Sequence, residues 1–380
     1  MKVLHVIQRP QLRGAEIFAS HMCRHLRERG DDVMLLSVFR GEANLPFDGD
    51  TIHLQRSYSN RFWDLKSWFQ LWKAIRSFRP DVVQANSGFT LKFVLFSKWL
   101  FRWKQPVIFR NASTMSQYIH SPLVRWFNSW FIKSSAAVAS VSQLSSDDLV
   151  KLYPSIKSRV NRIPTGIEEF KLNGVREKNQ PFTIIHEGGF TFEKNHKALV
   201  EIFARVKKSI PEARLWLVGD GPLKKETEQA CANAGISDSV TFFGYQTNVA
   251  EYLSSADLLV MTSVIEGMPA SILEAFYCRV PVVTYKAGGI AEIVEDEITG
   301  KLIAQGDADA FVKAVCKVYS SDEKNNWVNN ALQLVTTHYM NAVICDRFRS
   351  LYSRLIHQKP AVDVKTRIKE LSNAKHTYTR

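Results

Sequence analysis

Short apolar runs alternate with longer amphipathic stretches along most of this chain. Residues 2–7 and 32–39 are apolar and rich in β-branched side chains, which predicts buried strands, whereas residues 14–29 repeat their apolar positions at helical spacing. Later strands are expected at 81–85, 106–109, 136–141 and 160–163, with helices between them. Strands that alternate with helices are typical of a parallel α/β sheet, because a crossover must return the chain to the edge where the previous strand began.

The alternation pauses over residues 165–180, which are polar and contain Gly166 and Gly174, and then resumes. Further strands are expected at 182–186, 214–218, 240–242, 258–261 and 280–284. Further helices are expected at 194–209, 222–235, 269–278, 307–320, 323–336 and 341–357. The pattern predicts two Rossmann-like domains, 1–165 and 166–340, facing across a ligand-binding cleft. Residues 341–380 are expected to form a helix that packs back toward the first domain, followed by a polar tail.

Composition narrows the class of protein. With 45% hydrophobic residues in 380, the chain is a globular protein of two or three domains and not a disordered one. Its five cysteines are odd in number and form no CxxC pair, which disfavours a disulfide framework or a zinc module and favours a reducing cytosol. The apolar start ends at Gln8-Arg9-Pro10, too early for a signal peptide, and no run approaches the about 18 apolar residues of a membrane span.

The net charge of +13 is confined to the first half of the chain. Residues 1–165 hold 24 Lys and Arg against 11 Asp and Glu, whereas residues 166–380 hold 26 of each sign. This asymmetry predicts an anionic partner for the N-terminal domain, which is a membrane, a nucleic acid or an acidic substrate.

Three segments of the same half combine cations with large aromatic side chains. They are residues 61–73, 92–104 and 125–133. Aromatic rings beside Lys and Arg suit an anionic membrane interface, so we expect a cytoplasmic protein that is peripheral on the inner face of the cytoplasmic membrane. The alternative is core packing, because Trp68 and Trp72 lie one helical turn apart and such stripes are common in cores.

The most specific stretch for chemistry follows the predicted strand at 258–261. Gly267 permits a close backbone approach, and Pro269 suits the first turn of a helix, whose free amides can bind an anion. Glu266 precedes this helix and Glu274 lies within it, and carboxylates beside a phosphate site suit sugar hydroxyls as partners. Without further context, the same residues also fit an ordinary helix with a capping glutamate and an exposed one.

The order of several motifs resembles the retaining GT-B glycosyltransferases of family four. Glu266 and Glu274 match the E-x7-E motif of that family, and similar segments occur on both sides of it. These segments are 163–167, 193–195, 217–223, 240–244, 281–283, 288–289, 292–294 and Gly300. The resemblance implies an enzyme that moves a sugar from a nucleotide-diphosphate donor to a glycan or lipid-linked acceptor, with retention of configuration and without a metal, in surface polysaccharide or lipopolysaccharide synthesis.

The resemblance also implies roles for individual residues. Glu266 would contact hydroxyl groups of the donor sugar, Glu274 would bind the ribose hydroxyls, and Lys194 would neutralise the diphosphate. Gly244 and Tyr245 would border the nucleobase. The remaining residues of the implied donor site are Gly14, Gly188, Gly189, Gly267, Met268 and Pro269.

Two departures from the family pattern affect the phosphate part of this site. The family places an arginine five residues before the lysine, where this chain has Gly189. It also places two glycines in the loop of the first domain, where Arg13 precedes Gly14. One cation that would stabilise the leaving diphosphate is therefore absent from its usual position.

Arg110 and Asn111 come directly after the predicted strand at 106–109, where many relatives carry a histidine. We expect Arg110 to replace the missing positive charge across the cleft and Asn111 to take the histidine's place, which adds both to the predicted catalytic residues Glu266 and Lys194. The alternative is that both residues cap the strand in a surface loop.

Other functions fit the chain less well. A nucleic-acid-binding protein would explain the basic first domain but not the second, and a nucleotide-sugar-binding module without catalysis would explain the absent arginine. Gly219-Asp220-Gly221 is only part of the G-x-G-x-x-G motif of dehydrogenases. Asp48-Gly49-Asp50 resembles a metal-binding D-x-D motif, but it lies in the other domain and is interpreted as a turn.

Overall fold

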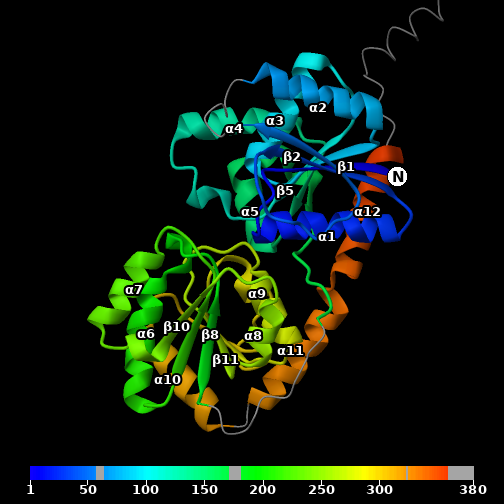
Figure 1. The fold of residues 1–380 in the computed structure, drawn as a ribbon. Coiled ribbons are helices and arrows are strands. Elements are labelled where there is room, and N and C mark those ends of the chain that lie inside the picture. The colour runs from blue at the N-terminus through cyan, green and yellow to red at the C-terminus, as the bar shows by residue number, and fades with distance from the viewer. Residues whose placement is uncertain (57–63, 171–180, 322–323, 358–380) are drawn as a thin grey trace, which may run out of the picture.

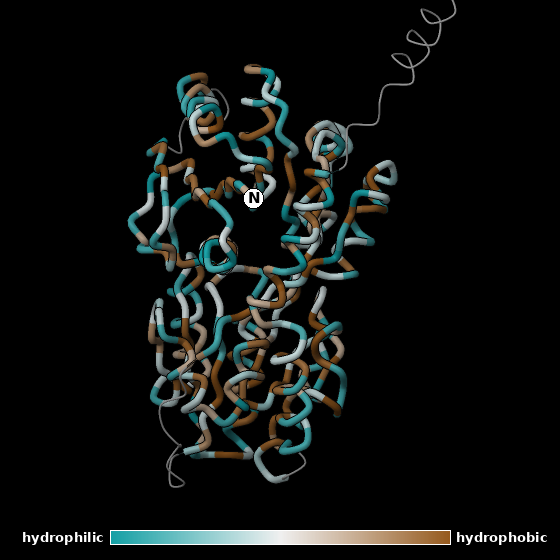
Figure 2. Tube along the Cα trace, turned by 90° about the vertical axis from the view of Figure 1, so that its right-hand side faces the viewer, coloured by the Kyte–Doolittle hydropathy of each residue, from teal (hydrophilic) through white to brown (hydrophobic). Residues whose placement is uncertain are grey.

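The computed structural model describes residues 1–56, 64–170, 181–321 and 324–357. It shows two α/β lobes, one above the other, each with a central sheet between helices (Figure 1). A view turned by 90° shows the same two lobes, with the N-terminus in the upper one (Figure 2). The α/β fold with two Rossmann-like domains is therefore as predicted.

Within the described residues, the N-terminal sheet has seven parallel strands in the order β3-β2-β1-β4-β5-β6-β7. The strands are β1 Lys2–Ile7, β2 Asp32–Phe39, β3 Asp50–Arg56, β4 Val82–Ala85, β5 Val107–Asn111, β6 Ala137–Ser140 and β7 Val160–Arg162. The helices are α1 Gly14–Glu28, α2 Leu65–Phe78, α3 Gly88–Phe101, α4 Pro122–Ser134 and α5 Gln143–Leu152.

The C-terminal sheet has six parallel strands among the same residues, in the order β10-β9-β8-β11-β12-β13. They are β8 Thr183–Glu187, β9 Arg214–Val218, β10 Val240–Gly244, β11 Leu258–Met261, β12 Val282–Tyr285 and β13 Lys301–Ile303. The helices are α6 His196–Ser209, α7 Lys224–Asn233, α8 Val249–Ser254, α9 Ala270–Tyr277, α10 Ala308–Ser320 and α11 Lys324–His338. In both sheets the strand order reverses beside the domain's first strand, where doubly wound folds bind ligands.

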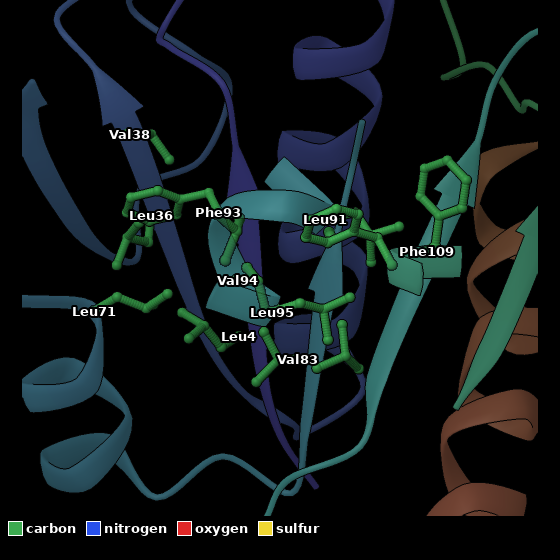
Figure 3. Close-up of a cluster of buried hydrophobic side chains, with 14 of the residues drawn as sticks. Leu4, Leu36, Val38, Leu71, Val83, Leu91, Phe93, Val94, Leu95 and Phe109 are labelled. Atoms are coloured by element: carbon green, nitrogen blue, oxygen red, sulfur yellow. The ribbon is translucent and has the colours of Figure 1, made fainter. Parts of the chain in front are cut away.

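The N-terminal core lies between the sheet and α2 and α3. Leu4 of β1 and Val83 of β4 meet Phe93 and Val94 of α3, and Leu71 of α2 closes the cluster (Figure 3). All five side chains are at most 2% exposed. Strands covered on both faces need apolar side chains at successive positions, which is why the sequence shows continuous apolar runs here.

Helix α12 (Asn341–His357) belongs to the core of the N-terminal domain, although α10 and α11 before it belong to the C-terminal one. Phe348 contacts Phe18 of α1 with 6.2 Å between ring centroids, and the Tyr352 hydroxyl donates a hydrogen bond to Gln84 Oε1 at 2.6 Å. Figure 1 shows α12 rising from the lower lobe to lie beside α1. The chain therefore crosses between the domains twice.

The carboxylate of Glu168 joins these two crossings. His25 of α1 lies 3.0 Å from Glu168 Oε1, and Asn341 at the start of α12 donates to the same oxygen at 2.6 Å. Burial alone would raise the pKa of Glu168, but the hydrogen bonds from His25 and Asn341 and the charge of His21 lower it to about 2. Glu168 therefore remains ionised and holds both crossings against α1.

The structure corrects one expectation and excludes one alternative in the first domain. Asp50 is not part of a turn, because it begins β3, an edge strand whose mostly polar side chains gave no apolar run to detect. Arg110 and Asn111 do not lie in a surface loop, because β5 continues through both and leaves them 3% and 2% exposed. The sequence analysis also did not predict strand β13 and helix α8. Residues 61–63, the linker segment 171–180 and the tail 358–380 lie outside the described residues.

Glu168→Gln is expected to lower the free energy of unfolding near pH 7 by roughly 2 kcal/mol, because the variant loses an ionised, hydrogen-bonded carboxylate. Since the folded-state pKa of about 2 lies below the usual value of 4.5 for a glutamate, this stability is present above about pH 5 and disappears as the pH falls toward 2. Urea unfolding of both proteins between pH 3.5 and 7 measures it. Glu28→Gln, whose side chain is 54% exposed, is the control and should change little. Parallel pH profiles for wild type and Glu168→Gln would contradict the assignment.

Candidate active site

The C-terminal end of β8 opens into a glycine turn over which Lys194 lies. Gly188 N–H donates to Val218 O at 2.9 Å, which holds the turn against β9. A Cβ atom on Gly188 would come within 3.0 Å of Lys194 Cε, so the missing side chain leaves the lysine its path across the strand ends. Asn195, which follows Lys194, has a φ of +53° and accepts from Ala198 N–H, which starts α6.

Lys194 meets Glu266 in an ion pair at the same sheet edge. Lys194 Nζ lies 2.6 Å from Glu266 Oε1, and the side chains are 20% and 10% exposed. The Thr262 hydroxyl, just after β11, donates to the carbonyl oxygen of Asn195 at 3.1 Å and ties the two loops together. The structure thus brings together two predicted site residues that are 72 positions apart in sequence.

A second carboxyl pair lies beside this ion pair and involves a residue that the sequence analysis missed. The carboxyl of Glu187, the last residue of β8, neighbours that of Glu274 on α9, and its Oε2 is buried with no hydrogen-bond partner among the described residues. Burial raises the pKa of both carboxyls, and the charge of Glu274 raises that of Glu187 further, against the opposing effect of Lys194. The sequence signal that could have identified Glu187 is an acidic residue at the end of a predicted buried strand.

Helix α9 begins directly after the loop that carries Glu266. Pro269 occupies the N-cap position with extended dihedral angles, and the free amides of the first turn follow from Ala270. Met268, beside it, is 7% exposed and packs in the domain core. Pro269 thus precedes the helix and does not lie in its first turn, where the sequence analysis placed it, and the binding of an anion by these amides stays a prediction.

Gly267 lies close to the backbone of the other domain, whereas the sequence analysis explained this glycine by the close approach of a ligand. A Cβ on Gly267 would lie 2.1 Å from the carbonyl oxygen of Ala112, directly after β5. Gly288, with a φ of +50°, approaches the backbone of Glu266 in the same way, since its Cβ would lie 1.8 Å from that carbonyl oxygen. Both glycines are therefore required by close backbone packing around the cleft.

Glu292 holds the two domains together on the far side of these glycines. Its carboxylate accepts hydrogen bonds from Gln143 N–H at 2.8 Å and Leu144 N–H at 3.0 Å, the first amides of α5. A carboxylate at a helix N-terminus is favourable because it meets free amides and the positive end of the helix dipole. Tyr118 adds a longer contact by donating to Glu193 at 3.3 Å. The carboxyl ends of both sheets therefore face each other.

Arg110 and Asn111 lie inside the N-terminal domain. The Arg110 guanidinium is 4.0 Å from the ring centroid of Phe18 and donates to Thr165 Oγ1 at 3.3 Å. Burial lowers its pKa to about 10, although the charge of Glu16 opposes this shift. Asn111 donates to Ser140 Oγ at 3.1 Å. None of these contacts is with Lys194 or Glu266, so the role of Arg110 in replacing the missing cation stays a prediction, as does that of Asn111.

The other predicted positions lie at the ends of strands or helices. Gly14 is the first residue of α1, and a Cβ there would meet nothing within 4 Å. Gly244 ends β10 with a φ of +68°, and Tyr245 after it is 50% exposed. A Cβ on Gly189 would find its nearest atom 3.5 Å away, so the backbone does not exclude an arginine at this position. Their contacts with a donor stay predictions.

Three further observations concern metals, disulfides and membranes. All five cysteines, each among the described residues, are free thiols. No group of three or more His, Cys, Asp or Glu side chains in the described ranges is arranged to hold a metal ion. No helix of the described part of the chain is long and apolar enough to cross a membrane.

Comparisons with known proteins agree with this architecture. Residues 12–169 match the family model described as Glycosyltransferase Family 4, and residues 168–334 match that described as Glycosyl transferases group 1. Anabaena HepE, whose crystal structure contains UDP and glucose, superimposes with a TM-score of 0.78 at 17% identity, over 93% of this chain and 100% of that one. At this identity the likeness concerns the fold alone.

Two curated relatives are similar in sequence. The N-acetyl-alpha-D-glucosaminyl L-malate synthase of Bacillus anthracis is 30% identical over 206 residues, which are 54% of this chain and 53% of the relative. The alpha-monoglucosyldiacylglycerol synthase of Streptococcus pneumoniae is 23% identical over 323 residues, 77% of this chain and 72% of the relative. The chain spans about half the length of the first relatives that it matches.

Two parallel sheets whose carboxyl ends face one cleft define the GT-B class of fold. The two matched segments adjoin and together span residues 12–334. Over these residues the chain is similar to the glycosyltransferases of family four and of group 1.

Gly267→Ala is expected to separate the loop before α9 from Ala112, because the added methyl group would overlap a backbone oxygen that cannot move away cheaply. We expect a loss of about 1–3 kcal/mol in unfolding free energy and faster hydrogen exchange around residues 264–270. Gly88→Ala is the matched control, since a Cβ there meets nothing within 4 Å. Equal stability and exchange in the two variants would show that the contact between the domains is not closed in solution.

Proposed function

We propose that this protein transfers a sugar from a nucleotide-diphosphate donor to a glycan or lipid-linked acceptor, with retention of configuration and without a metal ion. The observation that carries the proposal is the ion pair between Lys194 and Glu266 at the carboxyl edge of the second sheet, beside the start of α9. It places a cation, a carboxylate and free helix amides in one cleft, which is what the transfer of a sugar from a diphosphate requires.

The charges of the site match the charge that develops in the reaction. When the nucleoside diphosphate departs, negative charge grows on its phosphate oxygens, and Lys194 and the first amides of α9 stabilise it there. Glu266 holds Lys194 in position before the donor arrives and then accepts hydrogen bonds from hydroxyl groups of the donor sugar. The leaving phosphate accepts the acceptor's proton, so the proposed mechanism assigns no nucleophilic carboxylate.

UDP-sugars are the first donors to test, because the crystal structure of HepE, which has the same fold, contains UDP and glucose. The nucleotide part would lie over the ends of β8 and β10, with Glu274 at the ribose and Gly244 and Tyr245 near the base. Gly189 in place of an arginine favours one other candidate, a nucleotide-sugar-binding protein with weak or no catalysis.

The acceptor side of the proposal rests on an exposed aromatic surface of the basic N-terminal domain. Leu123, Trp126 and Trp130 of α4 are 72%, 56% and 54% exposed. The ring centroids of Trp126 and Trp130 lie 5.1 Å apart. Arg125 and Lys133 are on the same helix. We propose that this surface, the α4 face, binds anionic lipid on the inner side of the cytoplasmic membrane and brings the cleft to a lipid-linked acceptor in surface glycan synthesis.

Only part of the aromatic content belongs to that surface. Trp68, Trp103 and Phe131 are 5%, 8% and 2% exposed and lie in the N-terminal core. Core packing therefore explains these side chains, and the proposal for a membrane surface rests on the exposed ones alone. A lipid acceptor would agree with the pneumococcal relative, whose name contains a diacylglycerol lipid.

Lys194→Met is expected to reduce transfer from a UDP- or GDP-sugar by about 10²–10³-fold in kcat, because the departing diphosphate loses its cation. Lys197→Met, which removes an exposed lysine from the same helix region, is the control and should retain turnover. Transfer is measured with a panel of UDP- and GDP-sugars and an acceptor extract. Saturable donor binding without any transfer would favour the binding protein, and tight nucleic-acid binding without donor binding would reject the proposal.

Replacing both Trp126 and Trp130 by serine is expected to reduce binding to anionic phosphatidylglycerol vesicles by roughly tenfold or more, because two rings no longer enter the interface. Vesicle flotation at low salt measures the effect. Ile298→Ser, which removes an exposed apolar side chain from the C-terminal domain, serves as the control. The α4 face would be ruled out as the lipid contact if wild type failed to float with the vesicles, or if the double variant floated as well as wild type.

A further inference from the structure

Helix α5 of the N-terminal domain lies at the side of the upper lobe that faces the lower one (Figure 1). Its third amide, that of Ser145, is capped from within its own domain, because Ser142 Oγ accepts from it at 3.1 Å. Its first two amides, those of Gln143 and Leu144, donate to Glu292 of the C-terminal domain at 2.8 and 3.0 Å. The start of this helix is therefore fully hydrogen-bonded only when the two domains meet.

The carboxylate of Glu292 suits this position by charge as well as by geometry. Free amides and the helix dipole give the start of α5 a partial positive charge, which a carboxylate neutralises. Arg162 of β7 adds a longer contact from the same domain, with 3.7 Å between its Nη1 and Glu292 Oε2. The Glu292 side chain is 21% exposed, so water screens these contacts only in part. The contact between the domains is therefore specific for an anionic side chain.

The turn that carries Glu292 also packs on the loop before α9. This turn, the 3-10 helix η6, spans Gly288–Glu292. Gly289 N–H donates to the carbonyl oxygen of Gly267 in that loop at 3.0 Å. A Cβ on Gly289 would lie 2.0 Å from the same oxygen and 2.7 Å from Cβ of Ser142, the N-cap of α5. One glycine therefore fits between the loop before α9 and the other domain.

These contacts form a continuous path from the N-terminal domain to the ion pair of the candidate site. The start of α5 holds Glu292, and η6 holds the loop before α9, in which Glu266 lies 2.6 Å from Lys194. Gly288 adds a second close contact, since its Cβ would lie 1.8 Å from the carbonyl oxygen of Glu266. A displacement of α5 from Glu292 would therefore reach Glu266 through packed backbone.

We propose that Glu292 is a positioning residue of the transfer reaction: by capping α5 across the domain boundary, it sets Glu266 and Lys194 in a fixed orientation against the N-terminal domain. The inference rests on the proposed function, because it assumes that the donor binds beside Lys194. Glu292 itself need not touch the donor or the acceptor.

This role separates binding of the nucleotide from transfer of the sugar. In the proposed complex the nucleotide lies on the C-terminal domain, so its affinity should not depend on the cap of α5. Transfer needs both domains, because donor and acceptor must meet in one geometry. Loss of the Glu292 cap should therefore lower kcat and leave nucleotide affinity nearly unchanged, whereas damage to the C-terminal domain itself would weaken both.

The test compares wild type with Glu292→Gln and Glu292→Ala in the full chain. Glutamine keeps the size of the side chain, but it loses the charge and turns an N–H donor toward an amide that also donates. For both variants we expect kcat to fall by roughly 10–50-fold and the dissociation constant of UDP or GDP to change by less than about twofold. Turnover is measured as nucleoside diphosphate released from whichever UDP- or GDP-sugar wild type uses, and affinity by calorimetry. Glu295→Ala, which removes an exposed carboxylate three residues further along the chain, is the control.

Formate distinguishes an electrostatic cap from a packing role. In Glu292→Ala the amides of Gln143 and Leu144 lose the carboxylate that accepts from them in wild type. Formate carries the same charged group, so it should bind at these amides and raise the kcat of this variant by about threefold or more. Equal concentrations of chloride or of neutral formamide should not, and wild type should not respond to formate.

Hydrogen exchange tests the cap without any substrate. Peptides that cover residues 141–147 should exchange faster in Glu292→Gln than in wild type, because two amides lose a charged acceptor, whereas peptides from β8 and β11 should be unchanged.

The inference is overturned if Glu292→Gln keeps wild-type turnover, if nucleotide affinity falls as much as kcat, if residues 141–147 exchange equally in both proteins, or if formate does not rescue Glu292→Ala. If Glu292→Ala fails to fold, the turnover, affinity and exchange of Glu292→Gln decide alone. Absence of donor binding and turnover in wild type would instead reject the proposed function.

Discussion

The hydrogen bonds of Glu168 are the contact on which the arrangement of the two domains depends. The chain leaves the N-terminal domain beside Glu168 and returns to it at Asn341, and one carboxylate joins these points to His25 of α1. Because α12 then packs on α1 through Phe348, both crossings are fixed to one helix. The facing sheet edges then meet directly, where Gly267 approaches Ala112 and where Glu292 accepts hydrogen bonds from the first amides of α5.

The electrostatics of the cleft follow from that closeness. Lys194 is neutralised by Glu266, and burial raises the pKa of the neighbouring carboxyls of Glu187 and Glu274, so the described residues at this sheet edge carry little positive charge of their own. In the proposed complex with a nucleotide-diphosphate donor, the amides at the start of α9 would therefore have more of the diphosphate charge to stabilise than in a site with a second cation. An arginine at position 189 would meet no close backbone obstacle, which means that its absence reflects the choice of residue and not a limit of the fold.

The basic and aromatic character of the first domain separates into two physical roles. Trp68 of α2 and Phe131 of α4 lie in the core, whereas Trp126 and Trp130 of α4 are exposed. Composition alone does not distinguish the buried aromatic side chains from the exposed ones. Helical periodicity does distinguish them, and only the exposed side chains are available to a lipid surface.

The sequence by itself determined the features that depend on local pattern. Apolar runs separated by amphipathic stretches predicted two parallel α/β sheets, and the segment around Glu266 and Pro269 predicted a strand, a loop and a helix start in that order. The edge strand β3 was missed because an edge strand needs no continuous apolar run. Only the tertiary structure decided the proximity of Glu187 to Glu274, the cap that Glu292 forms on α5 and the inward direction of Arg110. Each of these depends on side chains from strands and helices far apart in the sequence, which only the packing of the folded chain brings together.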